Sequence, residues 1–462
     1  MTLVTKIMEY LKPRLVAIIL SLIAVLWLQA SNLVDPFSVD EDFRSFYWMN
    51  KYQDPDLFPN DPYRGNGSID IATPWGDWPY YPASTGYGLL FYAVNFVVPL
   101  LTISKLLPLI LMPLTVAYLY EFGRTVRSAK TGLILAVGFM LINLVSPTSV
   151  SLLTGLQRSF AFTLIVALIY YLERQRYIAA MITIVLAALI YPPMFMLGSV
   201  TWGFAALRIN REAWFPLVFD KHAFITLLIA GFLSMLITIP TLLTIFPHLF
   251  TPSEAAEVTV QTAPTHQSLW TNPHYQTDGR KALFSFFPFI GRVGLFDELL
   301  DGMNALILLT IGLLIVSVRG RRAFDLPRII YYLLLASIIT FVISWLAILL
   351  TNSFLLYLPS RYTRIGLSLF LMVFVFFNSE DFLKEAAFAI QRHQHKLIWL
   401  YVGVETFILS LIILYPSNDT GFLGFNMKWL LASAALVFGI LGTIKLKNGF
   451  TITSTPTQLG QT

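Results

Sequence analysis

The sequence contains no cysteine, which excludes disulfides, thiolate metal sites and a cysteine nucleophile. It is also poor in charge, because only 12% of its residues are Asp, Glu, Lys or Arg, against about 25% in soluble chains. Hydrophobic residues make up 56% of the 462 positions. A soluble fold of this length could not bury so much apolar surface, so the sequence predicts an integral membrane protein in contact with the lipid bilayer. The net charge of +5 comes from basic residues between apolar runs and does not indicate a nucleic-acid partner.

Apolar runs suited to crossing a bilayer recur along the chain. The predicted spans are approximately Leu15–Leu33, Leu101–Phe122, Thr131–Val145, Phe160–Leu172, Tyr177–Leu207, Phe224–Phe246, Ala305–Val318, Ile329–Leu350, Tyr362–Phe377, Leu397–Tyr415 and Phe425–Ile444. The run Tyr177–Leu207 is too long for one straight span and is interrupted by Pro192 and Pro193. We count it as two spans, although one kinked helix also fits. The interrupted segment Tyr87–Leu100 is expected at the membrane interface or as half of a helix pair.

The predicted fold class is therefore all-α, a polytopic transmembrane helix bundle with about 10–13 spans. Residues 1–450 are predicted to form a single transmembrane domain, and the polar tail 451–462 is expected to be disordered. For the first run we predict an uncleaved helix; the alternative is a signal peptide cleaved near Ala30 and Ser31.

The distribution of basic residues predicts the orientation of the chain in the cell membrane. With a cytoplasmic N-terminus, the inner segments hold 20 of the 31 basic residues and the outer segments hold 9. This bias follows the positive-inside rule. It places the two long loops, 34–85 and 248–301, on the extracytoplasmic side. The assignment depends on counting Tyr177–Leu207 as two spans. A single span would move every loop after Leu207 to the opposite side of the membrane.

The first outer loop is acidic, with nine carboxylates against three basic residues. Ser38 to Glu41 matches a capping box that opens a helix, which would hold Asp40, Glu41 and Asp42 just above the first span. Neighbouring carboxylates at a low-dielectric surface repel one another, so one could act as a base or the group could hold a divalent cation. The alternative is that these acids only stabilise a helix N-terminus.

Later in the same loop, aromatic residues surround one acid. Trp75 and Trp78 flank Asp77, an arrangement that suits a sugar ring but equally matches the aromatic belt of a membrane interface. In the second long loop His266 and His274 have no trustworthy metal-ligand spacing and are expected to be solvated.

Arginines at the outer ends of spans are candidates for binding phosphate. Arg158, Arg361 and Arg364 lie where the positive-inside rule disfavours them. A guanidinium offers paired donors that match phosphate oxygens. The alternatives are snorkelling to headgroups and ion pairs with the acidic loop.

These features resemble the GT-C class of membrane glycosyltransferases. The resemblance lies in Asp40-Glu41 after the first span, with Phe43 and Phe46 following, and in Arg361-Tyr362 at a late outer loop. The segment from Phe43 to Asp61 also resembles a group of bacterial multipass proteins with no assigned activity. The chain departs from well-known GT-C members because it lacks a soluble C-terminal domain, and the second acid of their site is not obvious here.

The resemblance implies transfer of a sugar from a polyprenyl-phosphate donor on the extracytoplasmic face. By analogy Asp40 would accept the proton of the acceptor hydroxyl, and Glu41 or Asp42 would orient the acceptor or bind a metal. Two other functions stay open: a transporter or flippase of a lipid-linked or sugar-like substrate, and a non-catalytic membrane protein.

Overall fold

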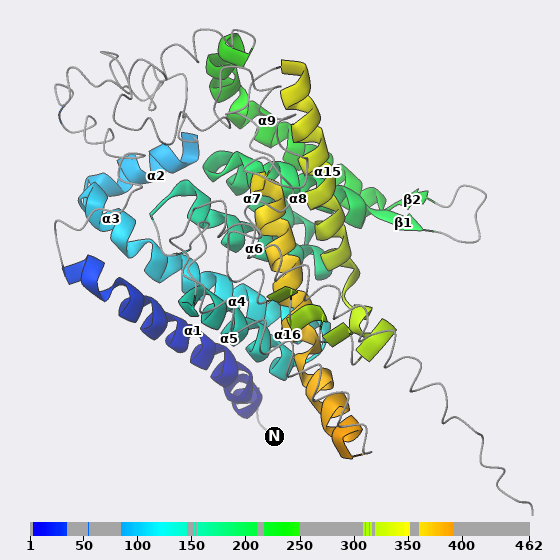
Figure 1. The fold of residues 1–462 in the computed structure, drawn as a ribbon. Helices are drawn as coiled ribbons and strands as arrows, with labels where there is room; N and C mark the ends of the chain where they lie inside the picture. Colours follow the sequence, from blue (N-terminus) through cyan, green and yellow to red (C-terminus); the bar gives the residue numbers. More distant parts are fainter. Residues whose placement is uncertain are drawn as a thin grey trace, which may run out of the picture. The chain divides into compact units, whose positions relative to one another are not determined.

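The computed structural model describes residues 3–34, 54, 85–145, 152, 155–209, 217–249, 308–309, 311–313, 315–316, 319–351 and 360–391. The helices are shown in Figure 1, and the chain divides into two compact units. Unit 1 comprises Met1–Leu299 and Arg328–Leu369, and unit 2 comprises Leu300–Pro327 and Phe370–Thr462. Each unit is described by itself below.

Helices form nearly all of the described structure. Unit 1 contains α1 (Leu3–Val34), α2 (Thr85–Asn95), α3 (Leu100–Leu106), α4 (Pro108–Val126), α5 (Ala129–Val145), the short 3-10 helix η3 (Gln157–Ser159), α6 (Phe160–Glu173), α7 (Tyr177–Ile190), α8 (Pro192–Ala206), α9 (Lys221–Leu249) and α15 (Arg328–Thr351). Helix α16 (Ser360–Gln391) begins in unit 1, and its later part belongs to unit 2 together with the 3-10 helix η6 (Gly320–Phe324).

Four of the described helical segments are long and apolar enough to cross a membrane. They are Pro13–Ala30, Leu100–Val126, Lys221–Ile239 and Ile365–Phe382. The predictions of an α-helical multi-pass membrane protein and of lipid contact are thus supported. The predicted spans Leu397–Tyr415 and Phe425–Ile444 lie outside the described residues.

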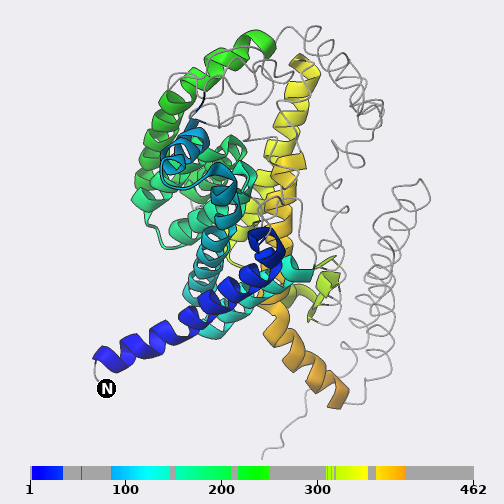
Figure 2. The same ribbon diagram turned by 90° about the vertical axis from the view of Figure 1, so that its left-hand side faces the viewer.

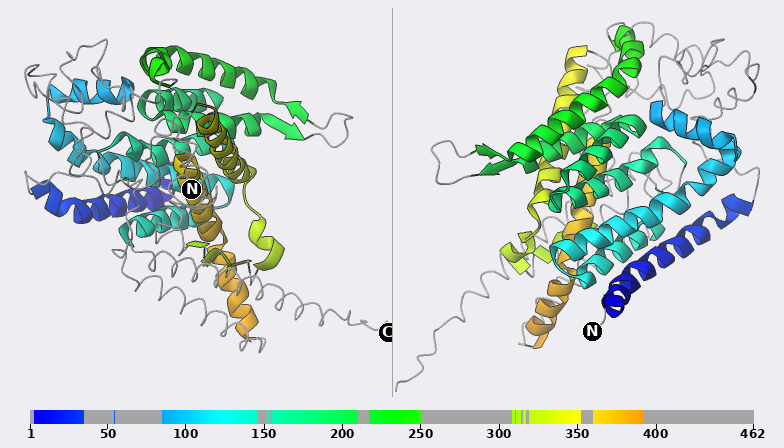
Figure 3. Two further views of the ribbon diagram at one scale, coloured as in Figure 1. Left: turned by 45° about the horizontal axis from the view of Figure 1, so that its top comes forward. Right: turned by 180° about the vertical axis from the view of Figure 1, so that it is seen from behind.

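The structure departs from a purely helical fold at one place. Strands β1 (Leu207–Ile209) and β2 (Leu217–Phe219) pair antiparallel, with Leu207 opposite Phe219. The backbone turns from helical to extended at Leu207, where α8 ends. The hairpin projects from the helices between α8 and α9 (Figures 1 and 3), and its three-residue strands are too short to give a clear alternating pattern in the sequence.

Small side chains mediate the packing of the lipid-exposed helices. On α1, Ala17, Ser21 and Ala24 are buried, on a helix that packs along α4 and α5 (Figure 3). On α9, Ala223 and Ala230 are buried, and this helix runs beside α7 and α8 (Figure 2). Close approach through small residues is typical of membrane helices, where hydrocarbon gives little drive for large apolar side chains to leave lipid.

The predicted break of the run Tyr177–Leu207 is confirmed. Helix α7 ends at Ile190, Tyr191 is not helical (φ −146°, ψ 84°), and α8 begins with Pro192 and Pro193 in its first turn. Proline suits these first positions because its missing N–H has no helical partner there. The two helices form a hairpin, since Tyr177 at the start of α7 stacks on Trp202 near the end of α8 with ring centroids 6.3 Å apart. The Tyr177 hydroxyl also donates to Asp220, just before α9, over 3.2 Å.

Contacts at helix ends define a basic end of unit 1. Arg14 of α1 lies 3.6 Å from Glu121 near the end of α4. Arg174, directly after α6, donates to Thr125 of α4 over 3.4 Å. The N-terminal half of α1 and the ends of α4 and α6 therefore meet, and α7 starts three residues after Arg174, at Tyr177. The residues predicted to face the cytoplasm around these helices do share one end of the unit.

Candidate functional site

Most of the predicted catalytic and sugar-binding residues fall outside the part of the chain that the structure describes. This applies to Asp40, Glu41, Asp42, Trp75, Asp77, Trp78 and the loop histidines His266 and His274. Arg361 and Arg364 are placed by their backbone in the first two turns of α16. Their predicted roles stay predictions, and Arg158 is the one member of the set whose surroundings the structure describes.

Arg158 lies in η3, the turn that leads into α6. Ser159 next to it is buried, and the Ser159 N–H donates to the carbonyl of Leu156 over 3.0 Å. Gly155 packs so closely on α3 that an added Cβ would lie 2.3 Å from the Cβ of Ser104. The Tyr87 hydroxyl of α2 donates to the Gly155 carbonyl over 2.7 Å. Two helices therefore hold the turn that carries Arg158, which limits the freedom of its backbone.

The acidic first loop joins unit 1 at the same end as Arg158. Its downstream attachment is Thr85, where α2 begins, and Tyr87 in the first turn of α2 bonds the turn before Arg158. Gly86 packs against Leu189 near the end of α7. The upstream attachment is Val34 at the end of α1, a helix that begins at the basic end and also contacts α3. We call this opposite end of the unit the loop end.

A buried carboxylate organises the basic end. The Glu121 side chain is only 6% exposed, and Arg124 donates to it from its own helix over 2.9 Å while Arg14 approaches from α1. The two arginine side chains remain 39% and 28% exposed for Arg14 and Arg124 respectively. Because desolvating an unpaired carboxylate is costly, these contacts fasten α1 to α4 at this level.

Hydroxyl groups link α4 to α6 between the two ends. The Thr115 and Thr163 hydroxyls lie 2.7 Å apart, both buried, and Thr115 also donates to the Leu111 carbonyl. One turn closer to the basic end, the hydroxyls of Tyr118 and Tyr171 lie 2.8 Å apart. The tyrosine pair therefore lies between the buried threonine pair and the charges of the basic end.

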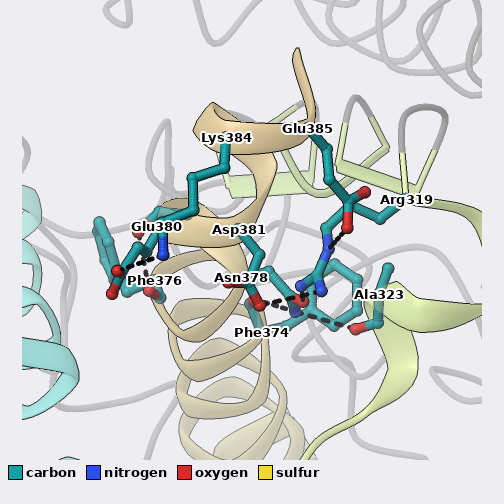
Figure 4. Close-up of polar contacts among 10 residues, drawn as sticks. Arg319, Ala323, Phe374, Phe376, Asn378, Glu380, Asp381, Lys384 and Glu385 are labelled. Carbon is teal, nitrogen blue, oxygen red and sulfur yellow. Dashed lines mark hydrogen bonds and ion pairs between the residues drawn. The ribbon is translucent and has the colours of Figure 1, made fainter. Parts of the chain in front are cut away.

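Unit 2 contains a second charged cluster, which sequence reasoning missed (Figure 4). Arg319, with a side chain only 9% exposed, bridges to Asp381 at 3.0 Å and to Glu385 at 3.5 Å. It also donates to the Asn378 side chain, whose amide donates to the Ala323 carbonyl at 2.9 Å. The signal was present, because Asn378, Asp381 and Glu385 follow helical spacing directly after the apolar run of α16. These contacts join the η6 turn to α16, so the role of the cluster in this structure is to stabilise the packing of the two elements.

Metal binding receives no support from the residues that the structure describes. Among them, no group of three or more His, Asp or Glu side chains is arranged to hold an ion. A divalent cation at Asp40 to Asp42 therefore stays a prediction about residues outside that set.

Comparison with known proteins assigns no family. No protein-family model matches the chain, and a search of curated proteins finds no similar sequence. The part of the chain that the structure describes is helical and contains four candidate membrane-spanning helices.

Proposed function

We propose that this protein is a multi-pass glycosyltransferase of the GT-C type in the cell membrane. It transfers a sugar from a polyprenyl-phosphate donor to an acceptor on the extracytoplasmic face, and its N-terminus is cytoplasmic. The observation that carries the proposal is the shared loop end: both attachment points of the acidic loop and the Arg158 turn lie on the side of unit 1 opposite the basic end. An acid and a phosphate-binding arginine need this common side to act on one substrate.

The proposed reaction needs one base and one group that stabilises a leaving phosphate. Asp40 accepts the proton of the acceptor hydroxyl as its oxygen attacks the anomeric carbon. The bond between that carbon and the phosphate oxygen breaks, and the lipid phosphate leaves with the bonding electron pair. Arg158, together with Arg361, pairs with the charge that develops on this phosphate.

The orientation is supported by charge. The basic end carries Arg14, Arg124, Arg127, Lys130 and Arg174, which the positive-inside rule assigns to the cytoplasm. The loop end then faces outward, where nucleotide sugars are not supplied and a lipid-linked donor is required.

The test is sugar transfer in membranes that contain the full chain. Radiolabelled glucose, mannose or arabinose on polyprenyl phosphate serves as donor, and incorporation into acceptor material is measured. Asp40→Asn should lower transfer by about a hundredfold or more, the range of a lost general base, at unchanged membrane insertion. Arg158→Gln should also lower transfer. The matched controls are Asp54→Asn in the same loop and Lys384→Gln, whose side chain is 67% exposed.

Two results contradict the proposal in different ways. Wild-type transfer by Asp40→Asn rejects the assignment of the base. A wild-type protein that transfers none of the sugars, but moves the lipid-linked donor between leaflets of proteoliposomes, identifies a flippase.

A further inference from the structure

The basic end of unit 1 carries an excess of cations next to a lipid-exposed helix. Six basic residues gather there on α1, α4, α5 and the turn after α6: Arg14, Arg124, Arg127, Lys130, Arg174 and Arg176. The carboxylates at this end of these helices are Glu121, Glu173 and Glu9, and the part of α1 that carries Glu9 also carries Lys6 and Lys12. Glu121 is held behind the arginines, because its side chain is 6% exposed while Arg14 and Arg124 are 39% and 28% exposed. The partly exposed charge of this surface is therefore positive.

The depth of this surface matches that of a lipid headgroup. Along one side of α4, Tyr118 is followed one turn later by Glu121 and one turn after that by Arg124, about 9 Å further along the axis. The hydroxyl pair of Tyr118 and Tyr171 has the amphipathic character of the membrane interface. We therefore place the guanidinium groups just beyond this pair at the level of the lipid phosphates.

The exposed side of α1 offers room for the acyl chains of the same lipid. Leu15, Ile19 and Ile23 recur every four residues, are all exposed, and begin one residue after Arg14. An apolar row that starts directly at a cation matches a phospholipid, whose chains and phosphate are joined. A soluble phosphate ion has no acyl chain and would not contact this apolar row.

We propose that Arg14 and Arg124, positioned by the buried Glu121, bind the phosphate of an anionic membrane phospholipid whose chains lie along the exposed side of α1. Basic pockets between the cytoplasmic ends of membrane helices are suited to anionic headgroups. Glu121 keeps the two guanidinium groups, which come from different helices, at one place. Each guanidinium has five donors and can bond the carboxylate and a phosphate together. This site is distinct from the proposed transferase site, since it lies at the opposite end of unit 1.

The test measures lipid binding to the purified full chain by native mass spectrometry. Phosphatidylglycerol and phosphatidylcholine are titrated separately, and the apparent Kd of the first bound lipid is compared. The wild type should prefer phosphatidylglycerol. Arg14→Gln and Arg124→Gln should each weaken its binding by about fivefold, the factor that corresponds to about 1 kcal/mol for each basic residue near a membrane surface, and leave phosphatidylcholine binding unchanged.

The variants are made singly, because each then leaves Glu121 with one arginine partner. Lys221→Gln is the control, since Lys221 is exposed at the start of α9. An equal loss in Lys221→Gln, or no loss in either arginine variant, overturns the proposal. Inorganic phosphate that competes as well as the lipid headgroup also overturns it, because the site would then take a soluble anion. If one arginine variant does not fold, the other decides the question in the same way.

Discussion

A single hydroxyl pair is expected to contribute measurably to the packing of α4 on α6. Replacing Thr115 or Thr163 by Val removes the bond between the buried hydroxyls at nearly constant volume. The coupling energy of the two replacements should be about 0.6 kcal/mol, and at most about 1.7 kcal/mol, as for other hydrogen bonds between membrane helices. Unfolding of the purified protein in SDS, followed by far-ultraviolet circular dichroism, measures it in a double-mutant cycle.

Thr201→Val is the matched control for that cycle. Its hydroxyl is also buried, but it donates to the Leu197 carbonyl within α8 over 2.8 Å. Thr115→Val and Thr201→Val should therefore be additive. If the coupling energy between Thr115→Val and Thr201→Val were as large as that between Thr115→Val and Thr163→Val, the measured energy would not report contact between helices.

At the scale of elements, the hairpin of α4 and α5 depends on a close approach at two glycines, Gly123 and Gly132. A Cβ added to Gly132 would lie 2.3 Å from the Tyr120 carbonyl oxygen, so Gly132→Ala must push α5 away from the α4 backbone. We expect a loss of about 1–3 kcal/mol, as for overpacking elsewhere. Gly231 of α9 has open space around its Cβ position, so Gly231→Ala should be neutral or stabilise by up to about 1 kcal/mol through helix propensity. Equal effects of the two changes, in the same SDS titration, would contradict the packing argument.

Helix boundaries were predictable where the sequence carries a local signal. Pro192 and Pro193 break a long apolar run, and the structure separates α7 from α8 there. The separation of α3 from α4 was missed, because Leu107 at the junction is apolar and keeps helical angles (φ −56°, ψ −41°). The local sign was Pro108 in the first turn of α4, a position that proline also takes in α8.

The surroundings of the charged residues were less predictable than their positions. The sequence indicated that Arg158 lies at the outer end of a span and that Arg14 precedes the first apolar run, since hydropathy alone defines such places. It did not reveal that Glu121 would hold Arg14, or that Asp381 would pair with Arg319. These partners are distant in sequence, and only packing of the helices decides which charges meet.

At the scale of the whole molecule, the absence of cysteine allows a direct test of orientation. Val97 is 84% exposed between α2 and α3 at the loop end, and Ala129 is exposed at the start of α5 beside Arg127 and Lys130. In intact cells, a membrane-impermeant maleimide should label Val97→Cys but not Ala129→Cys. Ala129→Cys should react only after the membrane is permeabilised. The reverse pattern would put the acidic loop in the cytoplasm and remove the basis for a lipid-linked donor.

The short α7–α8 hairpin has a consequence for the bilayer around it. These helices have 14 and 15 residues, which corresponds to about 21–23 Å, whereas the hydrocarbon layer is about 30 Å thick. Ile178, Ile182 and Leu186 are exposed on α7, so lipid chains meet this short apolar side directly. Hydrophobic mismatch of this size is relieved by local thinning of the membrane. The headgroups of lipids beside α7 would then lie closer to the middle of the bilayer. This shortens the distance that a headgroup must cross between the two leaflets on this side of the protein.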